Sequence, residues 1–209
     1  MSLMPLVIPI KQAAAISTIF SLLATVATFI RHFRDYDWKL GLAFLICVCI
    51  GVPAGVYFLD RASEKVLLRV LGVMMLVFAG REFLLSEQPK AIPRFLTVPL
   101  GLFSGTLSGA FNLGGIPTAA YAYSHPWTRG QIMAFLQVMI TVSSLLRIVF
   151  YKKFGMLQEF SLLNGLLLLV PLYLAIWLGH FVMTKVAPKH MRRAVFAFIG
   201  IAGLYYLTR

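Results

Sequence analysis

Long apolar segments alternate with short charged ones along the whole chain. About 20 apolar residues cross the hydrocarbon core of a bilayer as a helix. The pattern therefore predicts an all-α integral membrane protein with about seven transmembrane segments, at 12–31, 39–59, 66–85, 95–124, 129–150, 158–182 and 191–208. The third segment crosses only if Arg69 and Arg81 extend from its ends to the lipid headgroups. We find no linker that would divide the chain, so we expect one membrane domain.

Composition agrees with this class. The 209 residues are 60% hydrophobic and only 12% charged, more apolar than a soluble domain of this length requires. The net charge of +12 comes from 19 Lys and Arg against 7 Asp and Glu, which suits loops that meet the anionic headgroups of a lipid bilayer. We therefore expect no nucleic-acid partner, and an anionic solute in preference to a cation.

Titratable and metal-binding residues add little. All seven acids lie in loops or at segment ends, so no carboxylate is placed at the membrane midplane as a proton relay, which argues against cation transport and proton antiport. Cys47 and Cys49 are two residues apart, and no Cys/His spacing is typical of a metal site. We expect no metal and no cofactor. The N-terminal stretch MSLMPLVIPI has no charge before Lys11 and is not a standard signal peptide.

A faint repeat divides the chain into two related halves. A shift of 118 residues aligns Lys11 with Arg129, Thr25 with Ser143, and Val52-Pro53 with Val170-Pro171. Such repeats are common in secondary transporters. We expect a first repeat at 1–94 and a second at 95–209. A Gly-rich run precedes the aligned part of the second repeat only, so the first repeat is expected to be incomplete at its N-terminus.

The Gly-rich run 95–124 has 30 uncharged residues, more than one crossing needs. If it crosses once, Lys and Arg divide evenly between the two faces of the membrane. If it enters and returns on one side, the positive-inside rule places residues 32–38, 86–94 and 183–192 in the cytoplasm. We favour the re-entrant interpretation.

Two sets of small residues occupy this run. Gly101, Gly105 and Gly109 are four apart, which is typical of close helix contact. Contact does not explain the break that follows, whose residues weaken a helix: Asn112, Gly114, Gly115 and Pro117. Unwound backbone at membrane depth is tolerated only inside protein or beside a water-filled cavity. With Ser104, Ser108 and a new helix beginning at Pro117, the break predicts a site for a small oxyanion.

The next segment carries a matching polar face. Its small and polar residues follow 4-3-4-3 spacing, at Gly130, Ala134, Gln137, Thr141 and Ser144. Arg147 lies three residues further on. It is the one charge well inside an apolar run, which makes it a functional candidate; the alternative is that it extends to the headgroups with Lys152 and Lys153. The first segment has a similar stripe, Ser17, Ser21, Thr25 and Thr28.

The run GLFSGTLSGAFNLGGIPTAAYAY, a short turn with Arg129, and a helix ending LLRIVFY resemble the second half of the sulfite exporter TauE/SafE family. The stretches IPIKQAAAISTIF and GVPAGVYFLDRASEKVLLRVLGVMMLV resemble its first half. The resemblance covers nearly the whole chain and implies a membrane permease built on two related halves, associated with sulfite, sulfoacetate and other sulfur-containing or organic anions.

We therefore expect a multi-pass permease for a small sulfur-containing or organic anion, located in a bacterial cytoplasmic membrane, with a homo-oligomer kept open. The expected solute-binding residues are Ser108, Asn112, Gly114, Gly115, Pro117, Gln137, Thr141 and Arg147, and none is expected to be catalytic. Two alternatives remain. One is a rhomboid-type intramembrane serine protease, with Ser104 or Ser108 as nucleophile and His180 as base; the other is a membrane scaffold that transports nothing.

Overall fold

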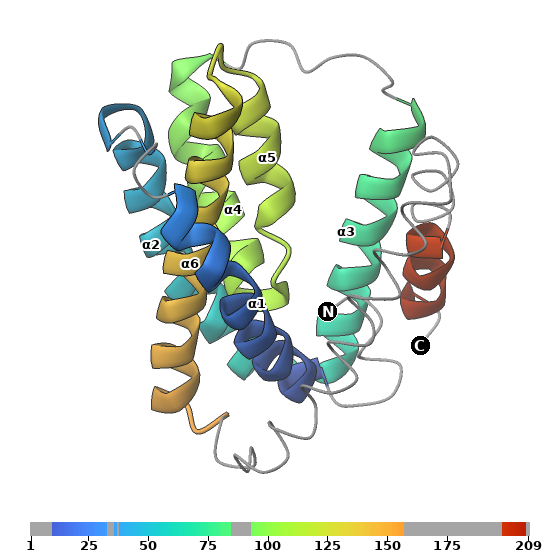
Figure 1. The fold of residues 1–209 in the computed structure, drawn as a ribbon. Helices are drawn as coiled ribbons and strands as arrows, with labels where there is room; N and C mark the ends of the chain where they lie inside the picture. Colours follow the sequence, from blue (N-terminus) through green and yellow to red (C-terminus); the bar gives the residue numbers. More distant parts are fainter. Residues whose placement is uncertain (1–9, 33–35, 37, 85–92, 157–197, 208–209) are drawn as a thin grey trace, which may run out of the picture. The chain divides into compact units, whose positions relative to one another are not determined.

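The computed structural model describes residues 10–32, 36, 38–84, 93–156 and 198–207 (Figure 1). These residues form helices and no strand. In chain order the elements are α1 (Ile10–His32), α2 (Trp38–Arg61), α3 (Glu64–Leu84), the short 3-10 helix η3 (Arg94–Leu96), α4 (Thr97–Phe111), α5 (Gly115–Tyr123) and α6 (Arg129–Lys153), followed by a terminal helix at Phe198–Leu207.

The helices agree with the apolar segments expected from the sequence. Each of the first three predicted segments is one helix, and the fifth is α6. The fourth segment, 95–124, is two helices, α4 and α5, as its break predicted. The sixth, 158–182, lies outside the described residues. By length and hydropathy, two of the described helices are able to cross a bilayer, Gly41–Arg61 and Arg129–Lys153. A count of seven crossings stays a prediction.

The described helices group into two compact units. The first contains α1, α2, η3, α4, α5 and α6, and the second contains α3 and the terminal helix. These bounds do not follow the two expected repeats, which stay a prediction. In the second unit α3 and the terminal helix approach closely, because a Cβ on Gly72 would lie 2.8 Å from the Gly203 carbonyl oxygen.

Glycines on two helices allow the closest packing in the first unit. A Cβ on Gly105 of α4 would lie 2.5 Å from the Val48 carbonyl oxygen of α2, and one on Gly51 would lie 2.5 Å from the Leu102 carbonyl oxygen. Gly109 and Gly55 face each other in the same way. The backbones of α2 and α4 are therefore in contact, as the four-residue glycine spacing predicted. Because contacts advance in step along both helices, α2 and α4 run parallel.

Helix α5 folds back along α4. Ser104, near the middle of α4, contacts Thr118 in the first turn and a half of α5, with 2.7 Å between the two hydroxyl oxygens. Thr97, at the start of α4, lies 3.1 Å from the hydroxyl of Tyr121. Contacts between early α4 and late α5 make the pair an antiparallel hairpin (Figure 1). This is the geometry that a re-entrant segment requires, and the position of the hairpin in a bilayer stays a prediction.

Helix α6 begins at a capping box. The Thr128 hydroxyl accepts a hydrogen bond from the Gln131 N–H at 3.3 Å, and the Gln131 side chain accepts one from the Thr128 N–H at 3.0 Å. Both groups satisfy helix-end donors that would otherwise lack partners. The cap fixes the turn after α5, so that α6 runs back past the tip of the hairpin.

Candidate functional site

Helix α4 ends in a left-handed residue. Asn112 has φ of 56° and ψ of 29°, a conformation that Asn tolerates better than most residues other than Gly. The Asn112 N–H donates to the Ser108 carbonyl at 3.0 Å and the Leu113 N–H donates to the Leu107 carbonyl at 3.2 Å. This pairing satisfies two carbonyls at the end of α4 and turns the chain into the break.

The N-terminal end of α5 is less fully hydrogen-bonded than the C-terminal end of α4 beside it. Helix α5 begins at Gly115, two residues earlier than the expected start at Pro117, because the chain resumes αR geometry at Gly114, whose φ is −61°. Pro117, which lacks an N–H, lies buried in the first turn. Among the residues that the structure describes, the N–H groups of Gly114 and Gly115 have no acceptor. The positive end of the α5 dipole is thus left open.

The Gly114 carbonyl holds the break in place. Its oxygen lies 2.7 Å from Ser104 Oγ and 2.8 Å from Thr118 Oγ1, and it accepts the Thr118 N–H at 3.2 Å. A Cβ on Gly114 would lie 2.6 Å from the Ser108 Cβ, whereas a Cβ on Gly115 would meet nothing within 4 Å. Gly114 is therefore packed tightly on its side-chain face, and Gly115 faces open space.

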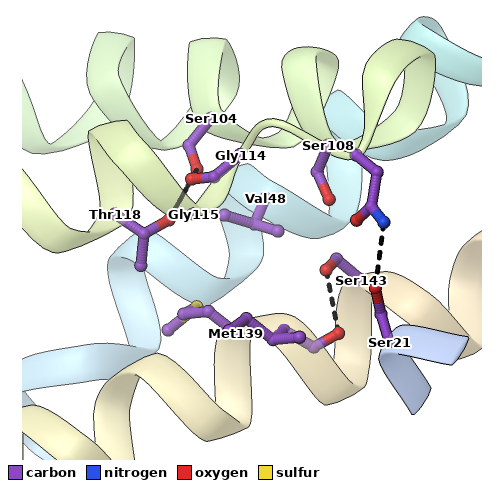
Figure 2. Close-up of a pocket in the computed structure, with 11 residues that line it drawn as sticks. Ser21, Val48, Ser104, Ser108, Gly114, Gly115, Thr118, Met139 and Ser143 are labelled. Atoms are coloured by element: carbon purple, nitrogen blue, oxygen red, sulfur yellow. Dashed lines mark hydrogen bonds between the residues drawn. The ribbon is translucent and has the colours of Figure 1, made fainter. Parts of the chain in front are cut away.

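Gly114 and the exposed Gly115 both line a cavity of about 170 Å³ at the break (Figure 2). By the same measure one water needs only about 10–15 Å³, so the cavity holds several waters or a small solute. Its walls come from five helices and carry no formal charge: Ser21, Val48, Ser104, Ser108, Asn112, Gly114, Gly115, Thr118, Met139, Ile140 and Ser143.

Ser108 is the hydroxyl most available to a bound molecule. The residue is only 6% exposed, and its Oγ has no hydrogen-bond partner among the described residues. In Figure 2 the side chain extends from α4 toward Ser143 of α6, into the cavity. The other hydroxyls are engaged: Ser143 donates to the Ile140 carbonyl, and Ser21 to the Ser17 carbonyl. Ser108 is thus a buried donor that points into a polar space.

Asn112 joins the hairpin tip to α1. Its amide Nδ2 lies 2.9 Å from Ser21 Oγ and 3.3 Å from the Ser17 carbonyl oxygen. A carbonyl only accepts hydrogen bonds, so the contact with Ser17 fixes which end of the amide faces α1. The polar stripe of α1 meets the break here, through Ser17 and Ser21.

Arg147 lies behind the cavity wall and not in it. The residue has no exposed surface. Its Nε donates to the Ser143 carbonyl at 3.2 Å, one terminal nitrogen to the Ser108 carbonyl at 3.2 Å, and the other to Ser144 Oγ at 2.8 Å. This geometry excludes the alternative that Arg147 extends to headgroups with Lys152 and Lys153. No carboxylate pairs with Arg147 among the described residues.

Tyr151 lies one turn further along α6 and completes the arrangement. Its hydroxyl donates to the Gly109 carbonyl at 3.2 Å, and the side chain is buried. Together with Arg147 it covers the last carbonyls of α4, the negative end of that helix dipole. At the break, therefore, the negative helix end is covered by donors while the positive end of α5 remains open.

The eight residues expected at the site fall into two groups. Four of them line the cavity: Ser108, Asn112, Gly114 and Gly115. The other four lie outside its lining: Pro117, Gln137, Thr141 and Arg147. The side-chain oxygens of Gln137 and Thr141 are buried without a hydrogen-bond partner. They lie on a different face of α6 from Met139, Ile140 and Ser143, which line the cavity. Solute binding by any of the eight stays a prediction.

The sequence pattern did not single out several lining residues. Val48, Met139 and Ile140 are apolar and give no local signal of a site. Two other lining residues could have been found from their positions: Thr118 directly follows Pro117 at the break, and Ser143 lies one turn before Arg147 on α6. Ser104 was considered as a nucleophile, but its hydroxyl engages Gly114 and Thr118. His180, its proposed base, lies outside the described residues.

Comparison with known proteins agrees with the sequence. A sequence model of the sulfite exporter TauE/SafE family matches residues 1–206. The chain is 25% identical over 201 residues to a probable sulfite/organosulfonate exporter TauE of Cupriavidus necator, covering 92% of this chain and 77% of the relative. It is 22% identical to a probable membrane transporter protein of Methanocaldococcus jannaschii, covering 95% of this chain and 79% of the relative.

No solved structure matches the chain. The family match covers nearly all of the sequence, and both relatives are named as exporter or transporter. The TauE/SafE family is a family of membrane transporters and not of enzymes, which removes the protease alternative. The chain belongs to the sulfite exporter TauE/SafE family and is a multi-pass integral membrane transporter.

Proposed function

We propose that this transporter moves a small sulfur-containing or organic anion, of the sulfite or organosulfonate type, and binds it in the cavity at the α4–α5 break. The observation that carries the proposal is a set of donors without partners, among the described residues, on residues that line one space. These are the N–H groups of Gly114 and Gly115 and the hydroxyl of Ser108. Backbone N–H groups at a helix N-terminus favour oxyanions.

The charge distribution supports the same ligand class. The cavity lining has no acid that would repel an anion. Arg147 contacts the Ser108 carbonyl from outside the cavity and has no carboxylate partner among the described residues. Its positive charge therefore raises the electrostatic potential in a region of low dielectric, where charges act strongly. A cation would meet the open positive end of α5 and an unpaired arginine behind it.

The donor arrangement also fits transport in preference to tight retention. Three neutral donors would hold an anion by ordinary hydrogen bonds. No direct ion pair forms, because Arg147 lies behind the cavity wall. A transporter needs a site from which the solute leaves again. We propose alternating access to this site, with the hairpin tip and its Asn112 contact to α1 as the boundary that opens.

Uptake of radiolabelled sulfite into proteoliposomes tests the proposal. Gly115 lines the cavity and is itself exposed, and a Cβ there meets nothing within 4 Å, so Gly115→Leu adds bulk beside the cavity without a clash. We expect it to abolish uptake while the protein purifies and melts like the parent. Gly80→Leu on α3, where a Cβ also meets nothing within 4 Å, is the matched control and should transport normally.

Two outcomes would contradict the proposal. If Gly115→Leu transports as fast as the parent, the cavity does not hold the solute. If the parent moves neither sulfite nor an organosulfonate under any imposed gradient, the substrate class is wrong. The scaffold interpretation would then be the better one.

A further inference from the structure

We infer that the cavity selects an anion that carries its own hydrogen-bond donor, such as hydrogen sulfite in preference to fully ionised sulfite, and that Asn112 is the residue that selects it. The inference rests on the proposed function. It goes further because it assigns a protonation state to the solute and a specificity role to one side chain.

The orientation of the Asn112 amide is the first step. Its Nδ2 faces the Ser17 carbonyl oxygen at 3.3 Å and Ser21 Oγ at 2.9 Å. Ser21 gives its own proton to the Ser17 carbonyl at 2.8 Å, so Ser21 Oγ accepts from Asn112. Both contacts require the N–H₂ end of the amide on this side. The oxygen Oδ1 is therefore directed away from α1.

The second step is that Oδ1 has no donor. Among the described residues Asn112 forms side-chain hydrogen bonds through Nδ2 only, and this half-buried residue lines the cavity together with Ser108 and the two glycines. The site thus offers three donors and one strong acceptor. An anion with only acceptor oxygens pairs with the donors but places a lone pair against Oδ1. An anion with an O–H or N–H group satisfies all four, whereas an anion without one displaces water from Oδ1 and gives it no donor in return, which is costly.

The third step concerns titratable groups, since pH changes the protonation of sulfite. No titratable side chain lines the cavity. The described titratable groups on the helices packed around it lie outside the lining, among them Lys11 with Asp60, the free thiols of Cys47 and Cys49, Tyr121 with Thr97, His125 with the Tyr121 carbonyl, Arg147 with Ser108, and Tyr151 with Gly109. Methanesulfonate keeps one charge over the pH range, so its uptake reports any effect of pH on the protein, and the remaining pH dependence of sulfite uptake reports the protonation of the solute.

The experiment compares two monovalent anions of similar size in proteoliposomes. Hydrogen sulfite carries an O–H group, and methanesulfonate carries a methyl group in its place. For the parent in mildly acidic medium we expect hydrogen sulfite to be preferred by about fivefold, the effect of one net hydrogen bond. At constant total sulfite, uptake should fall as rising pH removes that proton, while methanesulfonate uptake stays flat.

The variant Asn112→Gly removes Oδ1 and keeps the left-handed backbone that Gly adopts without strain. We expect it to abolish the preference and flatten the pH profile. Ser21→Ala is the control for the lost contact with α1, because it removes one partner of Nδ2 and leaves Oδ1. It should lower both uptake rates by the same factor.

The outcomes separate this inference from the proposal beneath it. If the parent transports both anions equally, or if Asn112→Gly retains the preference, Asn112 does not select the protonated anion. The proposed function, transport of a small anion, is unaffected by either result. If the parent transports neither anion, the proposed function itself fails. If Ser21→Ala also abolishes the preference, the selectivity belongs to the contact with α1 and not to Oδ1.

Discussion

A terminal guanidinium nitrogen of Arg147 donates to the backbone carbonyl of Ser108, 3.2 Å away, across the contact between α6 and α4. The same serine presents its hydroxyl to the cavity. Ser108 therefore has a charged group on its carbonyl side and the cavity on its hydroxyl side. Under the proposed function, Arg147 is a positioning residue that would act on a bound anion through the end of α4.

Replacing Arg147 should weaken anion binding more than it slows turnover. We expect Arg147→Gln to raise the KM for uptake by about tenfold, or about 1.4 kcal/mol, the interaction of two unit charges about 12 Å apart at an effective dielectric of about 20. Arg147→Lys keeps the charge but not the planar fork that reaches three acceptors, so it should restore part of the loss. Uptake measured against solute concentration separates the two parameters.

A purely structural role for Arg147 predicts a different result. In that case Arg147→Gln would lower the melting temperature and the maximal rate while the KM stayed at the parent value. Tyr151→Phe provides a reference, because it removes one neutral hydrogen bond to Gly109. That change should cost about 0.5–1.5 kcal/mol of stability and leave the KM unchanged.

The contact between α2 and α4 should be intolerant of a single methyl group. Gly105→Ala would place Cβ 2.5 Å from the Val48 carbonyl oxygen, and overpacking of this kind destabilises by about 1–3 kcal/mol. Gly80→Ala on α3 meets no atom within 4 Å and should be neutral or stabilising by up to about 1 kcal/mol. Thermal melts in detergent check both, and equal melting temperatures would contradict the close contact.

The two glycines of the break should respond in opposite ways. Gly114→Ala places Cβ 2.6 Å from the Ser108 Cβ, also against the Ser104 carbonyl, so we expect a loss of folded protein. Gly115→Ala meets nothing within 4 Å and should fold like the parent, with a smaller loss of uptake than Gly115→Leu. Size-exclusion profiles followed by uptake assays distinguish the two. A well-folded Gly114→Ala protein would show that the break is looser than its contacts indicate.

The hairpin makes a prediction about membrane sides. Phe95 precedes α4 and Tyr123 ends α5, and both are exposed. If α4 and α5 re-enter, Phe95→Cys and Tyr123→Cys are labelled by an impermeant maleimide from one side, in a background with Cys47 and Cys49 replaced. Lys153→Cys, at the far end of α6, is then labelled from the other side. Labelling of Phe95→Cys and Tyr123→Cys from opposite sides would mean a single crossing.

Local patterns predicted the helices and the break because their causes are local. Apolar length sets the helices, and Gly114, Gly115 and Pro117 weaken a helix wherever they occur. Glycines four apart predicted the contact with α2, since nothing larger fits between touching backbones. The start of α5 was misplaced by two residues, because Gly114 adopts αR geometry once its carbonyl is held by Ser104 and Thr118.

The cavity lining was harder to predict, since it depends on how helices rotate against one another. The polar face of α6 that includes Gln137 and Thr141 suggested a site, yet Met139, Ile140 and Ser143 line the cavity. Hydrogen bonds from Arg147 and Tyr151 join α6 to α4 in that rotation, and such long-range contacts leave no trace in residue spacing. The same contacts explain why Arg147 is buried behind the wall.

Two of the three donors at the break, the N–H groups of Gly114 and Gly115, belong to the main chain. Substitution of a side chain does not delete a main-chain donor. If the cavity binds an oxyanion as proposed, substitutions that leave the path of the backbone intact should therefore change which oxyanion fits while the preference for oxyanions remains. Volume and the acceptor at position 112 would then be the features that tune the solute.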